Sequence, residues 1–277
     1  MDKEVIKLKF MGSLITVEDI KKSRDFYENV LGQNVEADYG QNVSFGGFSI
    51  HLRPHFQMLI DNKEVVVGGN NFELYFEYDN LEQIVEKLKA EKVEFIHELC
   101  EAPWRQLGVK FYDPDKNIIE IGETLEYLSF RLHRQGNPFD EISKLTGLSR
   151  EFIEKSVQNQ YRNKAINCVK DTILPMQRKQ FEECGCCLDE QYKRYGNTEQ
   201  LFAKTIEVGH IYEIGYPACV CPDVASGKVK DVSHCECSRQ SILYVLGNLL
   251  PNKNISVEII ETALGGAEKC RFKVTVE

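Results

Sequence analysis

Two glutamates stand inside strand-like runs of apolar residues, and they are the first candidates for chemistry. Glu73 lies in residues 72–78, where apolar and polar side chains alternate with the two-residue period of a β-strand. Glu120 lies within Ile118–Ile121. Two carboxylates on one surface can hold a divalent ion, share a proton or pair with a cationic ligand. One of them could act as a general base if its pKa were raised toward neutrality.

Cysteines form the second set of candidates. Nine of the ten cysteines follow residue 163, and seven fall in three tight groups with His210 and His234 nearby: Cys184, Cys186, Cys187, Cys219, Cys221, Cys235 and Cys237. Four thiolates suit a tetrahedral zinc ion or an iron–sulfur cluster, so at least four of the seven are expected to converge on a metal. Redox or thiol-transfer chemistry and inert reduced thiols remain alternatives. Cys100, Cys168 and Cys270 are expected to be packing residues.

The elements around the two glutamates occur twice. Residues 72–123 predict a strand, a helix over 81–88 and three further strands that end at residue 121. Residues 7–52 predict the same order, with the first strand over Lys7–Val17 and a helix that ends at Gly32. A shift of 61 residues superimposes the two series, so the first half of the chain is an internal repeat.

Four short segments carry a resemblance to a known family. They are Val17–Ile20 with Phe26-Tyr27, Leu31-Gly32, Phe111–Asp115 and Asn117–Glu120. With them, residues 1–126 resemble the vicinal oxygen chelate superfamily, which includes glyoxalase I, bleomycin-resistance proteins and extradiol dioxygenases. The resemblance implies two βαβββ modules whose sheets curl into one cup. In metal-dependent members, four inward side chains at the cup floor hold a divalent ion.

The matching positions here are Gly12, His51, Glu73 and Glu120. Glycine departs from the family pattern because it offers no ligand. His51 and the two glutamates could still hold Mn²⁺, Fe²⁺, Ni²⁺ or Zn²⁺ with waters, whereas many members of the superfamily are metal-free binding cups. Trp104 is expected near the cup mouth, either stacking on a ligand or packed in a loop.

Bulk composition narrows the class of protein. The chain has 277 residues and a net charge of −9, and residues 1–126 alone carry −10. An acidic first domain is a poor match for nucleic acid. No apolar run approaches the ~20 residues of a membrane helix, and the first ten residues have no apolar signal core. We therefore expect a cytoplasmic protein that is not bound to a membrane.

The remainder of the chain predicts a connector and a second domain. Residues 127–162 read as a helical connector, and 137–157 resemble a helix-turn-helix, with Gly147 in the turn and Ser149 as a cap. DNA recognition and an αα-hairpin are the two interpretations, and the low positive charge favours the hairpin. Residues 163–277 predict an α+β cysteine-rich domain, with helices over 163–184 and 199–203 and a strand over 206–214. Gly265-Gly266 before a final strand resembles 4-vinyl-reductase-type sensor domains.

The sequence therefore predicts an α+β protein in which paired βαβββ modules form a cup, followed by a helical connector and a second α+β domain. The favoured function is binding or sensing of a small molecule, in a chain that could form a homodimer. One alternative is a metal-dependent lyase, isomerase or dioxygenase that uses His51, Glu73 and Glu120. Another is a DNA-binding regulator that uses residues 137–157.

Overall fold

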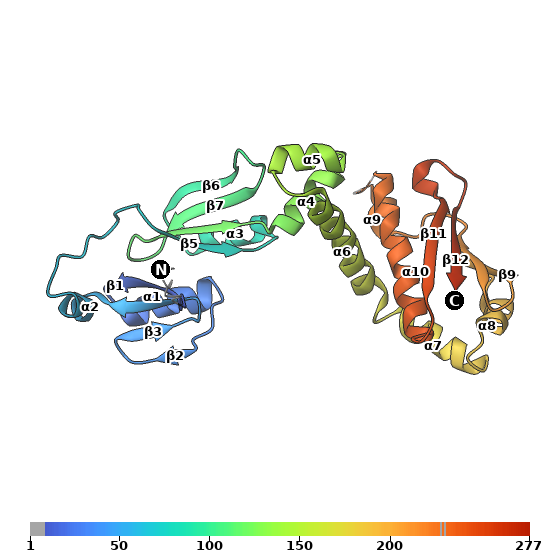
Figure 1. Cartoon of the computed structure of the whole chain (residues 1–277), viewed down its shortest axis with the longest axis horizontal. Coiled ribbons are helices and arrows are strands. Elements are labelled where there is room, and N and C mark those ends of the chain that lie inside the picture. Colours follow the sequence, from blue (N-terminus) through green and yellow to red (C-terminus); the bar gives the residue numbers. More distant parts are fainter. Residues whose placement is uncertain (1–8, 228, 230) are drawn as a thin grey trace, which may run out of the picture. The chain divides into compact units, whose positions relative to one another are not determined.

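The computed structural model describes residues 9–227, 229 and 231–277. The chain divides into two compact units, residues 1–128 and 129–277 (Figure 1). We call them the first and second unit. Each has a hydrophobic core of its own. In the described ranges, no helix combines the length and the apolar character that crossing a bilayer requires.

The first unit contains the predicted repeat. In the first module β1 and β4 are parallel neighbours, and the sheet order is β1-β4-β3-β2. The second module has the same order, β5-β8-β7-β6, with β5 and β8 parallel. The prediction of two βαβββ modules is thus confirmed. The bounds are β1 Ser13–Val17, α1 Ile20–Asp25, the π-helix η1 Phe26–Val30, β2 Ala37–Asp38, β3 Asn42–Ser44, β4 Phe48–Leu52, α2 Arg53–Leu59, β5 Glu73–Glu77, α3 Leu81–Ala90, β6 Phe95–Glu101, β7 Leu107–Tyr112 and β8 Ile118–Gly122.

Local sequence explains where these elements begin. Asp19 caps α1 by accepting from the backbone N–H of Lys22, and Asn80 caps α3 in the same way. Gly32 has a positive φ just after η1, as the sequence predicts for a helix end. The first predicted strand is shorter than expected, since β1 starts at Ser13. Residues 7 and 8 of that prediction lie outside the described residues.

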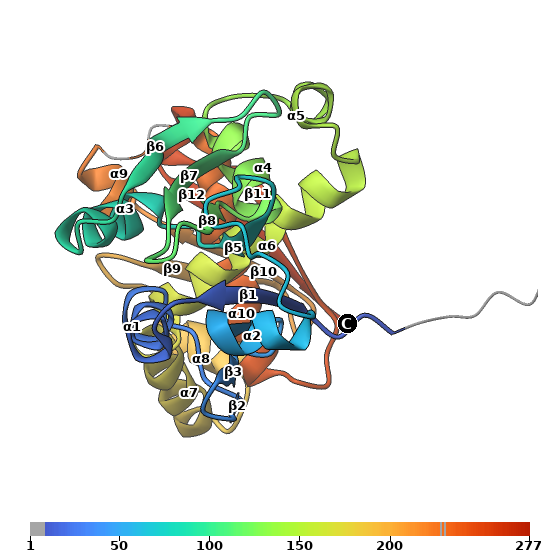
Figure 2. The same cartoon turned by 90° about the vertical axis from the view of Figure 1, so that its left-hand side faces the viewer.

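The two sheets share one core but do not join. In the described part of the first unit, no strand ladder links the first sheet to the second. The apolar faces of both sheets and the buried sides of α1, η1 and α3 form a single cluster. Phe48 of β4, for example, lies edge-on to Phe76 of β5 at 5.9 Å between ring centroids. The four positions expected to line one cup floor are therefore divided between two sheets (Figures 1 and 2).

Two buried aspartates in the turn between β7 and β8 hold the modules together. Asp113 accepts a 2.8 Å hydrogen bond from the hydroxyl of Tyr27, which is fully buried. Asp115 accepts from the backbone N–H of Glu18 at 2.7 Å, from Ser23 at 2.9 Å and from Arg53 at 2.8 Å. Burial raises the pKa of Asp113, although the hydrogen bonds that Asp113 accepts, among them the one from Tyr27, act in the opposite direction. A turn of the second module is thus bonded to α1 of the first.

The second unit surrounds a four-stranded antiparallel sheet of order β11-β12-β10-β9. Helix α10 lies against α6 and β11. The helix pair predicted over 137–157 is present as α5 and α6, with Gly147 in the left-handed region between them. The bounds are α4 Leu125–Arg134 (which begins in the first unit), α5 Phe139–Thr146, α6 Arg150–Val169, α7 Ile173–Glu183, α8 Leu188–Tyr195, β9 Phe202–Glu207, β10 Ile211–Tyr216, α9 Pro222–Ala225, the 3₁₀ turn η2 Val232–His234, α10 Cys235–Leu249, β11 Ile255–Glu261, the 3₁₀ turn η3 Ala263–Gly265 and β12 Cys270–Val276.

Three local predictions for this unit were wrong. The helix expected over 163–184 is broken between α6 and α7, because Pro175 near the start of α7 cannot continue a helix from α6. The strand expected over 206–214 is a hairpin that turns at Gly209, which has a positive φ. The helix expected over 199–203 is absent, and β9 starts at Phe202.

We predict that Asp115→Asn destabilises the first unit by about 3 kcal/mol, because it leaves the partly buried guanidinium of Arg53 without its buried partner. Trp104 is the only tryptophan of the chain and lies in this unit. Its fluorescence during urea denaturation therefore reports the transition.

Glu18→Gln is the matched control, since Glu18 also pairs with Arg53 but its side chain is 70% exposed. We expect Glu18→Gln to lower the free energy of unfolding by less than about 1 kcal/mol. Equal losses in the two variants would contradict the role given to Asp115.

Candidate functional site

The polar face of the second sheet brings Glu73 and Glu120 together. Side chains alternate along β5, so Glu73, Tyr75 and Glu77 share one face while Leu74 enters the core. In the β5–β8 register Tyr75 lies opposite Glu120, which places Glu120 on that same face. We call this surface the polar face of the second sheet. The two carboxylates predicted from the sequence to be neighbours are thus on one surface.

Lys110 of β7 lies between the two carboxylates. Its Nζ is 2.6 Å from Oε2 of Glu73 and 2.7 Å from Oε2 of Glu120. Burial alone would lower the pKa of Lys110, but its hydrogen bonds to Glu120 and Glu73 outweigh burial and the pKa is raised. The ammonium therefore stays charged and occupies the position in which a divalent ion would bridge the carboxylates. Sequence reasoning missed this residue, although a lysine between Val109 and Phe111 in a strand was the available signal.

A hydrogen-bonded chain of side chains continues this face. The indole N–H of Trp104 donates to the side-chain oxygen of Gln106 at 2.9 Å, and the amide of Gln106 donates to the hydroxyl of Tyr75 at 2.9 Å. Gly122 leaves room for that hydroxyl, since a Cβ there would lie 2.7 Å from it. Burial, with Glu77 and Glu120 nearby, raises the pKa of Tyr75, which remains a neutral phenol. Trp104 is 51% exposed, so about half of its surface is accessible to solvent.

His51 lies on the first sheet, and both of its ring nitrogens are occupied. Nδ1 is 3.0 Å from the amide nitrogen of Asn42, and Nε2 is 2.7 Å from Nδ1 of His55 in α2. Since the Asn42 amide donates to Nδ1, the proton of His51 sits on Nε2. Burial and the neighbouring His55 lower the pKa of His51, so the ring is neutral.

The fourth predicted position, Gly12, has a structural reason to be glycine. Its φ is 152°, and a Cβ would lie 2.9 Å from the carbonyl oxygen of Gly47. A side chain that could ligate an ion does not fit there. Within the described chain, His51, Glu73 and Glu120 do not form a group whose ligand atoms lie within 4.8 Å of one another.

The seven grouped cysteines lie on different elements. Cys184, Cys186 and Cys187 occupy the turn between α7 and α8. Cys219 and Cys221 precede α9, and Cys235 and Cys237 lie in the first turn of α10. The expected convergence of four thiols is not found: among the described residues, one potential metal-binding group of three or more side chains occurs, and it contains a single cysteine. Of the three presumed packing cysteines, Cys270 is buried, whereas Cys100 and Cys168 are exposed.

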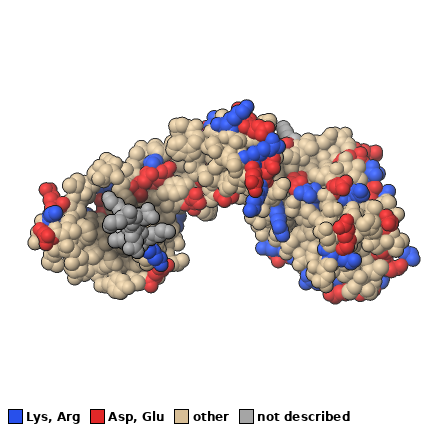
Figure 3. All heavy atoms as spheres, in the orientation of Figure 1, with Lys and Arg blue, Asp and Glu red and all other residues tan. Residues whose placement is uncertain are grey.

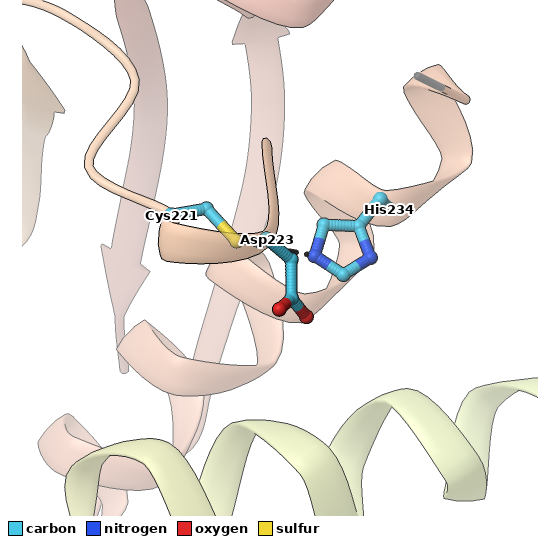
Figure 4. A group of neighbouring side chains, drawn as sticks. All are labelled: Cys221, Asp223 and His234. Carbon is cyan, nitrogen blue, oxygen red and sulfur yellow. Dashed lines mark hydrogen bonds between the residues drawn. The ribbon is translucent and has the colours of Figure 1, made fainter. Parts of the chain in front are cut away.

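That group consists of Cys221, Asp223 and His234, whose ligand atoms lie within 4.8 Å of one another (Figure 4). Sγ of Cys221 is 3.2 Å from Nε2 of His234. Asp223 accepts a 2.6 Å ion-paired hydrogen bond from Lys164 of α6. Burial, and then the positive charge of Lys164, lower the pKa of His234, so its imidazole is neutral. Sequence reasoning named Cys221 and noted His234, but it missed Asp223, although the aspartate lies two residues after Cys221.

Comparison with protein families identifies the first unit. Residues 10–126 match the family model described as a glyoxalase-like domain. This match and the βαβββ repeat support a glyoxalase-like fold for residues 10–126. No curated protein matches the chain. The resemblance of residues 163–277 to 4-vinyl-reductase-type sensor domains is not supported by these comparisons.

Solved structures match the same half of the chain. A protein of unknown function from Agrobacterium tumefaciens is 33% identical and covers 44% of this chain and 98% of its own, with a TM-score of 0.40. A lactoylglutathione lyase from A. tumefaciens is 18% identical, with coverages of 43% and 95% and a TM-score of 0.35. A glyoxalase-related enzyme from Fulvimarina pelagi is 17% identical, with coverages of 42% and 89% and a TM-score of 0.36. With TM-scores this low, the assignment depends on the family match and the topology.

The lowered pKa of His51 predicts a pH dependence of stability. The pKa of His51 in the folded state lies below the ordinary 6.5. At pH values between these two pKa values, the unfolded chain therefore binds a proton more readily than the folded chain. The contribution of His51 is therefore fully present above pH 6.5 and is lost as the pH falls through the folded-state pKa. We expect the wild type to lose stability relative to His51→Gln between about pH 7.5 and about pH 5.5, measured by urea denaturation with Trp104 fluorescence.

His97→Gln is the control, because His97 is a half-buried histidine in the other module of the same unit. If wild type and His51→Gln show the same change in free energy of unfolding over this range, the buried neutral state of His51 is wrong.

Proposed function

We propose that the glyoxalase-like unit binds a small organic molecule over the polar face of the second sheet, without a resident metal ion. The observation that carries this proposal is the position of Lys110, which already pairs with Glu73 and Glu120 at 2.6 and 2.7 Å. A divalent ion would have to displace this ammonium. It would also lack ligands from Gly12 and from His51, whose nitrogens are hydrogen-bonded elsewhere.

The charges of this face indicate the chemistry of the ligand. The face carries three carboxylates, those of Glu73, Glu77 and Glu120, and the ammonium of Lys110, so these groups together have a net negative charge. A neutral ligand rich in hydroxyl groups or a cationic ligand fits it, whereas an anion would be repelled. Trp104 supplies an aromatic surface on which a ring or an apolar part of the ligand can stack.

A homodimer would complete the predicted cup. Among the described strands, β1 and β5 are each at an edge of a sheet, and an edge strand can pair with another chain. We propose that β1 of one copy lies beside β5 of a second copy. His51 would then face Glu73 and Glu120 across the two chains, whereas the sequence predicted that they meet within one chain.

The alternative is a metal-dependent lyase, isomerase or dioxygenase that uses His51, Glu73 and Glu120. It is supported by the family match of residues 10–126. It requires both the homodimer and the departure of Lys110, which makes it the second choice.

DNA binding through residues 137–157 is the third candidate. The helix pair has the expected turn, but Arg150 is paired with Asp140 and Glu154. On the face shown in Figure 3, acidic and basic side chains of the second unit are interspersed and do not form one continuous basic surface. Nucleic-acid affinity depends on uncompensated positive charge, so this candidate is disfavoured.

For the second unit we propose a metal-binding role. The supporting observation is that Cys221, Asp223 and His234 have ligand atoms within 4.8 Å of one another. A neutral histidine, a thiol and a carboxylate are ligands that zinc accepts. The other six grouped cysteines are not needed for this site.

The role of Lys110 can be tested with metal ions. We expect Mn²⁺ or Ni²⁺ to leave the urea-unfolding transition of the wild-type first unit unchanged. In Lys110→Ala, the freed carboxylate pair should bind the ion and gain about 2–3 kcal/mol at concentrations near a hundred times Kd.

Lys89→Ala is the control. Lys89 lies in α3 and its ion pair is with the exposed Glu98 of β6, not with Glu73 or Glu120. Stabilisation of the wild type and of Lys110→Ala by the same amount would contradict a metal-free site and favour the metal-dependent enzyme.

Ligand binding can be tested by screening cationic, polyhydroxyl and carboxylate-bearing small molecules against the quenching of Trp104 fluorescence. We expect cationic or polyhydroxyl compounds to bind and carboxylates not to bind. Glu120→Gln should weaken binding by about tenfold, equivalent to ~1.4 kcal/mol. Glu98→Gln should leave it unchanged, since Glu98 is an exposed residue paired with Lys89. Preferential binding of carboxylates would overturn the proposed ligand class.

A further inference from the structure

The second unit contains a large cavity beside the Cys221, Asp223 and His234 group. Its volume is about 740 Å³, which is the size of a site for a drug-sized molecule. It lies between α7, the segment before β9, the segment before α9 and the first turns of α10. Much of its wall is apolar, from Val169, Ile173, Met176, Leu201, Tyr216 and Val220.

Two of the three donor residues line this cavity. Cys221 and His234 are part of the wall, and Asp223 follows one residue after the lining residue Pro222. In Figure 4 the sulfur, the carboxylate and one ring nitrogen point toward a common region. The donors come from α9, from the residue before it and from η2, so two separate elements, and not one helix, assemble the site.

The spacing of the donors suits a tetrahedral ion. Bonds of about 2.3 Å to sulfur and about 2.0 Å to nitrogen separate the two ligand atoms by roughly 3.5 Å at the tetrahedral angle. Sγ of Cys221 and Nε2 of His234 are 3.2 Å apart. The site would therefore need to open by a few tenths of an ångström. Lys164, bonded to Asp223 at 2.6 Å, orients the carboxylate from outside the group.

A cysteine nucleophile with a histidine base is the competing interpretation of the same residues. In such a site, a third group holds the imidazole through its second nitrogen. Nδ1 of His234 is buried, and it has no hydrogen-bond partner in the described part of the chain. Asp223 therefore does not orient the ring in that way. The three residues are arranged as donors around one point and not as a relay.

We propose that Cys221, Asp223 and His234 hold a zinc-like divalent ion whose fourth position faces the cavity, and that this position takes the head group of an apolar ligand. The inference rests on the metal-binding role proposed above for the second unit. Structural zinc sites have four protein ligands, whereas sites with three leave a position for water or a substrate. Cys237 also lines the cavity but does not belong to the group of converging donors.

Charge identifies the head group. A thiolate and a carboxylate cancel the two charges of the ion, and the ammonium of Lys164 adds one positive charge beside it. A single negative charge on the ligand then neutralises the site. The apolar wall accommodates a hydrocarbon or aromatic body. The ligand class is thus a monoanion, such as a carboxylate or hydroxamate, that carries an apolar chain.

Cobalt substitution of the full-length, metal-free protein tests the metal site. Co²⁺ bound to a thiolate gives a charge-transfer absorption and intense ligand-field bands. We expect both in the wild type and their loss in Cys221→Ser, a change of one atom. Cys219→Ser is the matched control, because Cys219 lies in the same segment but outside the group, and it should retain them. Circular dichroism confirms that both variants are folded.

Octanohydroxamic acid then tests the open position, with octanol as a probe of the same chain length without the anionic group. We expect the hydroxamate to shift the cobalt bands and to bind at least tenfold more tightly to the cobalt protein than to the metal-free protein. Octanol should show no such difference. Asp223→Asn should weaken cobalt binding.

The outcomes separate the two proposals. If cobalt binds through Cys221 but the hydroxamate leaves the bands unchanged and binds equally without metal, the open position is wrong and the metal-binding role stands. If the wild type does not bind cobalt, or if Cys221→Ser gives the same spectrum, the metal-binding role is wrong and the further inference is wrong with it.

Discussion

The turn that carries Asp113 and Asp115 determines the arrangement of the glyoxalase-like unit. Its carboxylates are buried and bonded to Tyr27, Ser23, Arg53 and a backbone N–H of the first module. Buried carboxylates are costly without such partners, so the modules can meet in few ways. This contact places α1 against the second module, and the two apolar sheet faces share a core. The polar face of each sheet, with its candidate ligands, is then left on the side away from that core.

Electrostatics on the second sheet decides what this unit can bind. Two carboxylates on one face would repel each other or recruit a cation. The chain supplies that cation itself through Lys110. In the pairing of β7 with β8, Lys110 lies directly opposite Glu120. In the proposed metal-free site, this side chain supplies the positive charge that a metal ion would otherwise bring. Because Gly12 cannot accept a side chain and His51 is hydrogen-bonded to Asn42 and His55, the remaining positions agree with this replacement.

The second unit uses its cysteines in a different way from the first expectation. Cys184, Cys186 and Cys187 lie in the turn after α7, whereas Cys221 before α9 is close enough to Cys235 and Cys237 of α10 to contribute to their raised pKa values. Burial raises the pKa of Cys237 to about 12 and raises that of Cys235, so these two thiols keep their protons. Cys221 instead lies with a histidine and an aspartate at the wall of a large cavity. Mixed donors at a cavity wall suit a site that exchanges a ligand better than a purely structural one.

The sequence by itself determined the repeat and the strand positions, which follow from local periodicity, since alternate residues of a strand point the same way whatever surrounds it. That Glu73 and Glu120 share one face was expected from the family resemblance and depends on the pairing of β5 with β8. The place of Lys110 between the glutamates depends on the register of β7 against β8, which no local pattern specifies. The separation of His51 from the glutamates was decided by the packing of the two modules through Asp113 and Asp115. The meeting of Cys221, Asp223 and His234 was decided by the position of η2 beside α9 in the folded chain. Contacts between residues distant in sequence are set by how whole elements pack, and that is why only the tertiary structure revealed them.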